Sequence, residues 1–340
     1  MINPLIETLH LPDAPAIPGL TVRRFQGESD FPKMADLIIA CNLADQIEEL
    51  TTAEELAHNY AHLSNCDLSQ DMLLVEIDDE LAGFAFVLWR DEDEGTRQYF
   101  QRGCVRPAWR RQGLGRALLK WSEGRAREIA AGHPIDRPRY LRVWCWCFGA
   151  VVGKAAMLER EGYRVARRHY LMRRPTLDEL PDAPVPPGLE LRPVQPEHLR
   201  AIWDGMVEAF RDHWGAGPVT EEDYTGWRDS PQHDLGLWQV AWDGDQVAGL
   251  SINMSSQAEN EHFQRKEFWV EDLAVRRPWR KRGLGRALLV NSMRLLRDEY
   301  GMTSAALGVD TENLSGALRL YESVGFQPVQ SAAVYRKPLT

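Results

Sequence analysis

Apolar residues along this chain recur with two periods, one of two residues and one of three to four. Residues 269–275 alternate as a half-buried strand does, and a series with the spacing of an amphipathic helix follows. The positions on that helical face are Leu288, Leu289, Ser292, Met293, Leu295, Leu296 and Tyr300. Gly301 supplies the residue type that commonly ends such a helix. This pattern predicts a strand, a glycine-containing turn and a helix, in that order.

The same order of elements occurs twice in the chain. LPDAPAIPGL at 11–20 returns as LPDAPVPPGL at 180–189, and these proline-rich stretches are typical of the entry to a domain. Three further pairs of segments correspond: 72–89 with 237–254, 104–119 with 274–289, and 158–175 with 321–338. The strongest match joins CVRPAWRRQGLGRALL to AVRRPWRKRGLGRALL. The chain therefore contains two copies of one fold.

The distance between the copies, about 170 residues, is too long for a stacked repeat array. We predict an N-terminal domain over residues 1–176 and a C-terminal domain over residues 187–340. Each copy reads as a strand, helices, several strands, a glycine-rich turn, a helix, a strand, a short helix and a last strand. The predicted fold class is α/β (α+β), with a mixed central sheet and flanking helices in each domain.

Composition narrows the class of protein without changing this organisation. Hydrophobic residues make up 44% and charged residues 26% of the 340 residues, as in soluble globular proteins. No apolar run is long enough to span a membrane and the first residues lack the features of a signal peptide, so we expect a cytoplasmic protein. The formal net charge of −10 disfavours nucleic acid as a partner and mildly favours a cationic substrate. No pattern indicates an oligomeric state.

All five cysteines precede residue 150, and their odd number argues against a disulfide framework and for a reducing compartment. In VWCWCF, alternation places Val143, Cys145 and Cys147 on one face of a strand. No second pair of ligands stands nearby at the spacing of a zinc site. We therefore expect strand packing here and no bound metal.

A helix in the second copy begins directly after the basic, glycine-containing turn RKRGLG at 280–285. Its first turn presents unpaired backbone N–H groups and the positive end of the helix dipole, and glycines let an anion approach closely. The turn RRQGLG stands at the matching place in the first copy. Neither the Walker pattern nor that of a dinucleotide fold is present, so the predicted ligand is the pyrophosphate of another molecule.

Both copies resemble the GNAT superfamily of acyl-CoA-dependent N-acetyltransferases, arranged as a tandem pair. The family pattern Arg/Gln-x-x-Gly-x-Gly/Ala is matched by Arg280, Gly283 and Gly285, and again in the first copy. The resemblance implies acetyl-CoA (coenzyme A) as cofactor, with its pyrophosphate at this turn and its pantetheine along the preceding strand, between two parallel strands that splay apart. The residues implied to bind it are Leu273, Ala274, Val275, Arg280, Lys281, Arg282, Gly283, Leu284, Gly285, Arg286 and Asn313, and in the first copy Val105, Arg110, Gly113, Gly115 and Arg116.

Acetyl transfer to an amine needs a group that accepts the amine proton. Glu271 and Asp272 are adjacent in the strand before the second turn, and alternation predicts one on each face, so that one of them points toward the cleft. Gln101 and Arg102 stand at these places in the first copy, and neither can act as a general base at neutral pH. The alternative role for Glu271 is that of a solvated strand residue.

The leaving thiolate needs a proton donor, and here too the copies differ. DTENLSGALRLYESVGF resembles the family's Asn followed by Tyr-x-x-x-Gly-Phe, in which the tyrosine donates that proton. Asn313 and Tyr321 match, whereas the first copy has Ala150 and Leu158 at these places. The alternative role for Tyr321 is that of a half-buried packing aromatic.

Residues 209–227 lie where the family places helices and a loop over the acceptor site. They combine aromatic with acidic side chains, which could hold a cationic amine, or could form an amphipathic helix with solvated acids. These side chains are Phe210, Trp214, Tyr224 and Trp227, with Asp212, Glu221, Glu222 and Asp223.

These observations predict a tandem N-acetyltransferase. The C-terminal domain transfers an acetyl group directly to a small-molecule primary amine, with Tyr321, Glu271 and Asp272 as candidate catalytic residues. The N-terminal domain is degenerate and non-catalytic, and either binds coenzyme A or keeps a vestigial site. Within the family, a mycothiol-synthase-like enzyme and an aminoglycoside acetyltransferase are alternatives. The alternative of another class is an acyl-CoA-binding sensor without turnover.

Overall fold

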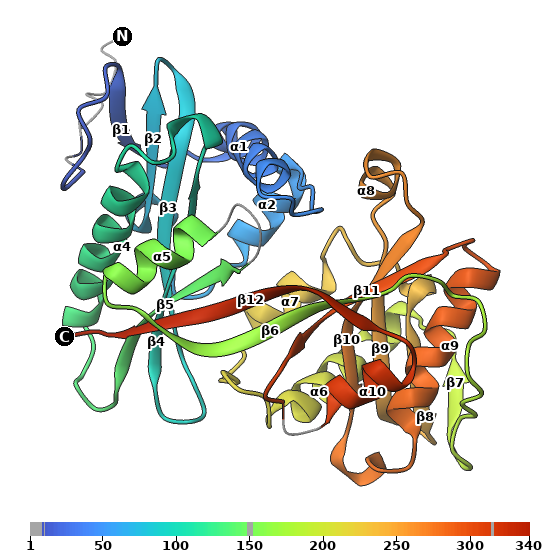
Figure 1. Cartoon of the computed structure of the whole chain (residues 1–340). Helices are drawn as coiled ribbons and strands as arrows, with labels where there is room; N and C mark the ends of the chain where they lie inside the picture. Colours follow the sequence, from blue (N-terminus) through green and yellow to red (C-terminus); the bar gives the residue numbers. More distant parts are fainter. Residues whose placement is uncertain (1–8, 10, 148–151, 314–315) are drawn as a thin grey trace. The chain divides into compact units, whose positions relative to one another are not determined.

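The computed structural model describes residues 9, 11–147, 152–313 and 316–340 (Figure 1). The chain divides into two compact units. The first unit comprises Met1–Ala166, Gly217–Gly226 and Ala333–Thr340, and the second comprises Arg167–Ala216 and Trp227–Ala332. The two units and the two predicted copies divide the chain at different positions. Gly217–Gly226 and Ala333–Thr340 lie in the second copy of the sequence but belong to the first unit.

The first unit is built on a sheet of strand order β1-β2-β3-β4-β5, antiparallel except for the parallel pair β4 and β5. Its strands are β1 (Leu20–Arg24), β2 (Met72–Ile77), β3 (Glu80–Asp91), β4 (Arg97–Val105) and β5 (Arg139–Trp146). Its helices are α1 (Phe31–Ala44), α2 (Ala53–Ala61), α3 (Leu68–Asp71), α4 (Leu114–Ala131) and α5 (Val152–Arg160).

Helices cover both faces of this sheet, with α4 on one face and α1 on the other (Figure 1). Alternate residues of β2 pack in opposite directions: Leu73 and Val75 contact the cluster that contains α4, whereas Met72 and Leu74 contact the cluster that contains α1. The near-continuous apolar run of β2 follows from this burial on both faces.

The second unit repeats the arrangement with the order β7-β8-β9-β10-β11, again antiparallel except for the parallel pair β10 and β11. Its strands are β7 (Glu190–Arg192), β8 (Gln239–Asp243), β9 (Gln246–Met254), β10 (Glu267–Val275) and β11 (Ser304–Asp310). Helices α6 (Leu199–Phe210), α8 (Gln257–His262), α9 (Leu284–Asp298) and α10 (Ala317–Ser323) belong to this unit, and α7 (Glu221–Arg228) lies in both assigned segments.

Helix α9 confirms most of the predicted helical face, because Leu288, Leu289, Ser292, Met293 and Leu296 are buried. Tyr300 is a correction, since α9 ends at Asp298 and the tyrosine side chain is 42% exposed. Gly301 follows with a φ of 66°, and the backbone N–H of Met302 donates to Leu296 O at 3.0 Å. The chain thus turns away from the helix at the predicted glycine.

Each copy gives its last strand to the other copy's sheet. Strand β6 (Arg164–Arg174), the end of the first copy, pairs antiparallel with β11 from His169–Asp310 to Arg174–Ala305. Strand β12 (Gln327–Pro338), the end of the second copy, lies next to β5, and Ala333–Thr340 belong to the first unit. The sequence predicted domains 1–176 and 187–340, which meet at a single linker. That boundary stays a prediction, and it describes where each sequence copy begins and ends.

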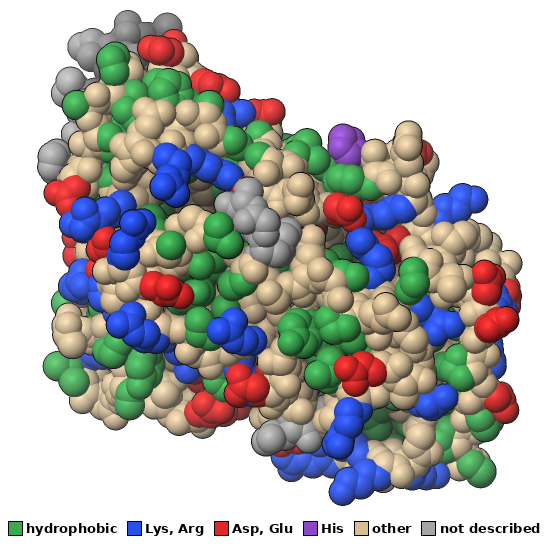
Figure 2. Space-filling model, viewed as in Figure 1, with side chains coloured by type: hydrophobic (Ala, Val, Ile, Leu, Met, Phe, Trp, Pro, Cys, Tyr) green, Lys and Arg blue, Asp and Glu red, His purple; other side chains and the backbone are tan. Residues whose placement is uncertain are grey.

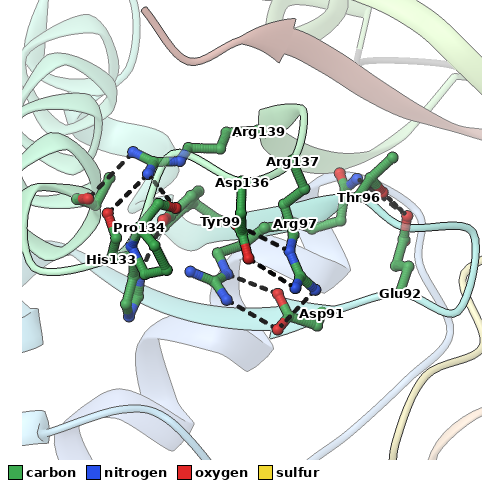
Figure 3. A network of polar contacts seen from close by, with 12 residues as sticks. Asp91, Glu92, Thr96, Arg97, Tyr99, His133, Pro134, Asp136, Arg137 and Arg139 are labelled. Atoms are coloured by element: carbon green, nitrogen blue, oxygen red, sulfur yellow. Dashed lines mark hydrogen bonds and ion pairs between the residues drawn. The ribbon is translucent and has the colours of Figure 1, made fainter.

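Charged side chains fix the start of the parallel pair in the first unit (Figure 3). Asp91 accepts hydrogen bonds from Arg97 at 2.6 and 2.9 Å and forms an ion pair with Arg137 at 3.2 Å. Arg139 donates to the carbonyl oxygens of His133 and Pro134 at 2.8 and 2.7 Å. These contacts hold β4 and β5 together at one end, so that any divergence occurs at the other.

Several sequence predictions can be compared with the described residues directly. Strand β5 buries Val143 and Cys145 on one face and leaves Trp144 exposed, which confirms strand packing for residues 143–146; Cys147 follows the strand and Phe148 lies outside the described residues. Among the described residues no cluster of acidic, His and Cys side chains could hold a metal ion, and no helix there is long and apolar enough to cross a membrane. Basic and acidic side chains intermix on the face shown in Figure 2, so the net negative charge forms no single patch there.

Candidate active site

The parallel strands diverge in both units. In the second unit, β10 and β11 pair only from Glu267–Ser304 to Val270–Leu307, although β10 continues to Val275. In the first unit, pairing between β4 and β5 likewise stops after four residue pairs, at Phe100–Arg142. Beyond these points one edge of β10 and of β4 has no described strand beside it. Its backbone groups can therefore bind an extended ligand as a further strand would.

A β-bulge lies at the point where β10 separates from β11. Val270 is opposite Asn253 and Asp272 is opposite Ile252, which leaves Glu271 as the additional residue. The prediction of Glu271 and Asp272 on opposite faces rested on unbroken alternation, and the bulge interrupts that alternation. The corresponding strand of the first unit, β4, pairs with β3 without a register shift.

Desolvation changes the acidity of both carboxyl groups at the bulge. Burial, followed by the charge of Glu271, raises the pKa of Asp272 from 3.8 to about 7. Desolvation also raises the pKa of Glu271, although this residue is exposed, so the effect on Glu271 is weaker support for a catalytic role than that on Asp272. Asp272 therefore changes its charge near neutral pH, where a general base is most effective.

Tyr321 lies in α10 and is 8% exposed. Burial, followed by the charge of Asp272, raises the pKa of its phenol well above the usual value. The tyrosine therefore keeps its proton at neutral pH. The charge of Asp272 acts on Tyr321 and that of Glu271 acts on Asp272, so these contributions link the three predicted catalytic residues in one electrostatic neighbourhood.

The glycine-rich turn has the same backbone conformation in both units. Gly283 and Gly113 precede α9 and α4 with φ of 85° and 97°, and no side chain caps either helix. Lys281 and Arg111, two residues earlier, also have positive φ, of 61° and 65°. Such conformations are costly for side chains other than glycine and are found where the backbone is shaped for a ligand. The uncapped N–H groups form an anion site of the predicted kind.

The side chain of Arg280 is bound within the second unit. Its Nε donates to Val275 O at 2.9 Å, one Nη donates to Ala209 O at 2.9 Å, and the other donates to Asp212 at 2.8 Å. Asp212 also forms an ion pair with Arg277, and hydrogen bonds from these two arginines hold its pKa well below the usual range. Arg280 thus fixes the turn to the end of β10 and to the end of α6.

Arg110 makes equivalent contacts in the first unit. Its Nε donates to Val105 O at 2.9 Å, and its two Nη atoms donate to Asp45 at 2.5 and 2.9 Å. Sequence analysis missed Asp45 and considered Asp212 only as an acidic residue over the acceptor site, not as the partner of Arg280. The available signal was an aspartate just after the first long helix of each copy, at α1 and α6. Arg110 and Arg280 therefore fix the position of the anion site by bonding to protein groups. Their guanidinium groups are engaged in these contacts and do not point freely toward a ligand.

The other predicted coenzyme-binding residues of the second copy differ in their burial. Ala274 and Leu284 are buried and anchor the turn in the core. The half-buried or exposed ones are Leu273, Val275, Lys281, Arg282, Gly285, Arg286 and Asn313. Arg282 donates to Pro187 O at 3.1 Å and Arg286 donates to Ser323 Oγ at 3.2 Å. In the first unit Arg116 forms an ion pair with Glu161 at 2.5 Å.

A cavity of about 1370 Å³ occupies the first unit between its diverging strands. It reaches from the turn at Gly113 and Gly115 to Leu158. Trp144 and Trp146 line it without filling it. This cleft therefore has room for a ligand the size of a nucleotide.

The first cleft lacks the acid–base groups of the second. The backbone N–H of Tyr163 donates to Leu158 O at 3.0 Å, just as that of Phe326 donates to Tyr321 O at 3.1 Å, so Leu158 holds the position of the tyrosine. Gln101 is buried and donates to Tyr163 Oη at 2.7 Å. Ala150, which the sequence sets opposite Asn313, lies outside the described residues.

The acidic side chains of residues 209–227 are bound by the protein itself. Besides Asp212, Glu222 forms an ion pair with His62 at 2.5 Å, and Asp223 accepts a hydrogen bond from Ser64 at 3.1 Å. Residues Gly217–Gly226 belong to the first unit. These contacts favour a structural role for Asp212, Glu222 and Asp223.

Comparison with known proteins identifies the family. Residues 199–326 match the Acetyltransferase (GNAT) family and residues 69–166 match an Acetyltransferase (GNAT) domain. The chain is 31% identical over 302 residues to the mycothiol acetyltransferase of Salinispora arenicola, covering 87% of this chain and 91% of that protein. A GCN5-related N-acetyltransferase from Sphaerobacter thermophilus superposes with a TM-score of 0.69 at 28% identity, covering 97% of both chains.

The tandem arrangement also has a solved counterpart. A tandem GNAT protein from the clavulanic acid biosynthesis pathway superposes with a TM-score of 0.68 at 15% identity, covering 94% of this chain and 99% of that one. At that identity the likeness shows the fold alone. Together with the matches over both copies, it establishes that this chain belongs to the GNAT family of acetyltransferases and is a tandem-domain N-acetyltransferase.

Proposed function

We propose that the second unit acetylates the primary amine of a small molecule directly, with acetyl-CoA as donor. Acetyl-CoA supplies an acetyl group activated as a thioester. The uncapped first turn of α9 would hold its pyrophosphate, and the unpaired edge of β10 near Leu273 and Val275 would hold its pantetheine. Gly283 supports this fit, because its φ of 85° shapes the turn so that the backbone N–H groups of the first helical turn stay uncapped by any side chain.

Asp272 is the proposed general base and Tyr321 the proposed general acid. The Asp272 carboxylate accepts a proton from the attacking amine, and Tyr321 Oη donates a proton to the thiolate that leaves. Glu271 tunes the base, since its charge contributes to the raised pKa of Asp272. One observation carries this proposal: burial and then the charge of Asp272 raise the pKa of Tyr321, whereas the first copy has Arg102 and Leu158 at these two positions.

The acceptor is proposed from the relatives. Those similar over most of this chain are named mycothiol acetyltransferase, so the first candidate is the desacetyl form of mycothiol. The experiment is release of coenzyme A thiol from acetyl-CoA, measured with desacetyl mycothiol, an aminoglycoside and a panel of simple primary amines. Acceptor-dependent release identifies the substrate class. Binding of acetyl-CoA without release for any acceptor would instead support a sensor.

Matched variants locate the reaction in one unit. Gly285→Glu and Gly115→Glu place the same carboxylate at the first turn of α9 and of α4, and neither glycine has a positive φ, so the backbone tolerates both changes. Acceptor-dependent release should fail in Gly285→Glu and persist in Gly115→Glu. The reverse result would move the reaction to the first unit.

A further inference from the structure

Two of the five cysteines share one wall of the first-unit cavity. Cys41, from α1, and Cys104, from β4, both line it and pack in the same apolar cluster. The Cys41 thiol donates at 3.2 Å to the backbone oxygen of Val105, the residue that follows Cys104, which brings Cys41 close to Cys104. The second copy has Ala274 where the first has Cys104. This thiol pair therefore belongs to the cleft that lacks acetyl-transfer chemistry.

The surroundings give the two thiols different acidities. The interaction with Cys104, and then the guanidinium of Arg110, lower the pKa of Cys41, while burial and the charge of Asp45 oppose them. The interaction with Cys41, then burial and the charge of the Cys41 thiolate, raise the pKa of Cys104. The contributions of Cys41 end once its thiolate is bonded to another sulfur, so Cys104 becomes more acidic at that step, unlike a thiol whose pKa burial alone raises. A thiolate is the nucleophile in thiol–disulfide exchange. Cys41 has the character of the attacking thiol, and Cys104 that of the thiol that resolves the adduct.

We propose that Cys41 and Cys104 are a redox-active pair that reacts with a small disulfide bound in the first-unit cavity. The Cys41 thiolate attacks one sulfur of the disulfide RSSR, forms a Cys41–SR bond and releases RS⁻. Cys104 then attacks the Cys41 sulfur, its proton passes to the second RS⁻, and an intramolecular disulfide forms. The two protein thiols are oxidised and RSSR is reduced to two molecules of RSH.

The same cavity indicates which disulfide is recognised. Its far end is the anion site at Gly113 and Gly115, with Arg111 and Arg116 beside it, and its volume of about 1370 Å³ accommodates a nucleotide. A disulfide whose substituent carries a diphosphate, such as coenzyme A disulfide, fits both ends. This choice of ligand rests on the anion site of the first unit and is independent of acetyl transfer by the second.

Other cysteines of this unit provide matched controls. Cys66 packs in the same apolar cluster and donates to Val87 O at 3.4 Å, but burial raises its pKa to about 12. Burial also raises the pKa of Cys145, to about 11. These thiols remain protonated at neutral pH and should react slowly.

The experiment treats the full chain, reduced and freed of reductant, with coenzyme A disulfide or with glutathione disulfide. Intact mass and peptide mapping without reductant follow the products. The wild-type chain should lose two hydrogen atoms and link the peptides that contain Cys41 and Cys104. Cys104→Ser should trap a coenzyme A adduct on Cys41, Cys41→Ser should form neither product, and Cys66→Ser should behave as wild type.

Recognition of the diphosphate is tested by comparing the reaction rates of two disulfides. Coenzyme A disulfide should react about tenfold faster than glutathione disulfide or more, as expected when a basic cleft concentrates an anion, and Gly115→Glu should remove this advantage. Equal rates for the two disulfides would overturn the choice of ligand. Absence of the Cys41–Cys104 link, or a stable adduct at Cys66, would overturn the thiol pair itself. Neither result would affect the acetyl-transfer assay, because its residues lie in the second unit.

Discussion

Replacing Asp272 with asparagine tests the proposed base through both stability and turnover. Burial and the charge of Glu271 raise the pKa of Asp272 from 3.8 to about 7, so above pH 7 the folded protein holds a carboxylate that unfolding would solvate better. At about 1.4 kcal/mol for each pH unit between 3.8 and about 7, the cost to the free energy of unfolding approaches about 4 kcal/mol. An asparagine of nearly the same shape carries no such cost.

The sign of the effect sets the pH window. Below the unfolded pKa the aspartate is protonated in both states and costs nothing, and the cost grows as pH rises until it is complete above the folded pKa of about 7. Asp272→Asn should therefore raise the free energy of unfolding by about 2 kcal/mol at pH 5 and by up to about 4 kcal/mol at pH 8. Urea unfolding followed by tryptophan fluorescence at both pH values measures the difference.

Asp272→Asn should lower the turnover rate although it raises the stability. Loss of a general base typically lowers the rate by about 10²- to 10⁴-fold, and the remaining activity should no longer rise with pH through 7. A variant that is more stable and yet turns over like wild type would refute the role of the carboxylate as base. A variant with equal stability at both pH values would refute the desolvation argument, whatever its activity.

Three further predictions concern the same clefts. Tyr321→Phe should lower kcat by about 10- to 10⁴-fold with coenzyme A affinity nearly unchanged, and a wild-type kcat would assign the proton donor elsewhere. Glu271→Gln should shift the rising limb of the pH–rate profile to lower pH without removing it, because one of the two causes of the raised pKa of Asp272 is lost while burial remains; a vanished limb would make Glu271 the base. Calorimetry with coenzyme A should show two sites per chain, with one lost in Gly115→Glu and the other in Gly285→Glu; a single site that Gly115→Glu leaves intact would refute binding by the first unit.

Local features of this fold could be predicted from sequence because each is encoded by residues close together in the chain. The strand, turn and helix around Gly283 follow from a period-two segment, a glycine pair and a helical face that are contiguous. Because the domain is duplicated, the same pattern occurs twice and each copy supports the prediction for the other. The replacement of Tyr321 by Leu158 could be seen for the same reason, and the backbone oxygen of each residue accepts the equivalent hydrogen bond at the end of its helix.

Other features depend on choices that the sequence leaves open. The strand ends LMRRP at 171–175 and VYRKP at 334–338 are so alike that either could complete either sheet, and the exchange of β6 and β12 cannot be deduced from them. The bulge at Glu271 is set by its register against β9, which alternation within β10 does not reveal. The contact of Arg280 with Asp212 joins residues 68 positions apart and appears only after α6 has packed.

The exchange of last strands sets the order in which this protein can be completed during synthesis. The first unit lacks a strand beside β5 until β12 has been synthesised, and an unpaired strand edge can pair with wrong partners. The final residues of the chain are bound firmly: Arg336 pairs with Glu92 at 2.8 Å, Lys337 pairs with Glu123 at 2.8 Å, and the backbone N–H of Leu339 donates to Arg139 O at 3.0 Å. The first copy therefore cannot complete its sheet before the last strand of the second copy has been synthesised, and a stop codon just before Ala333 would damage the first unit more than the second.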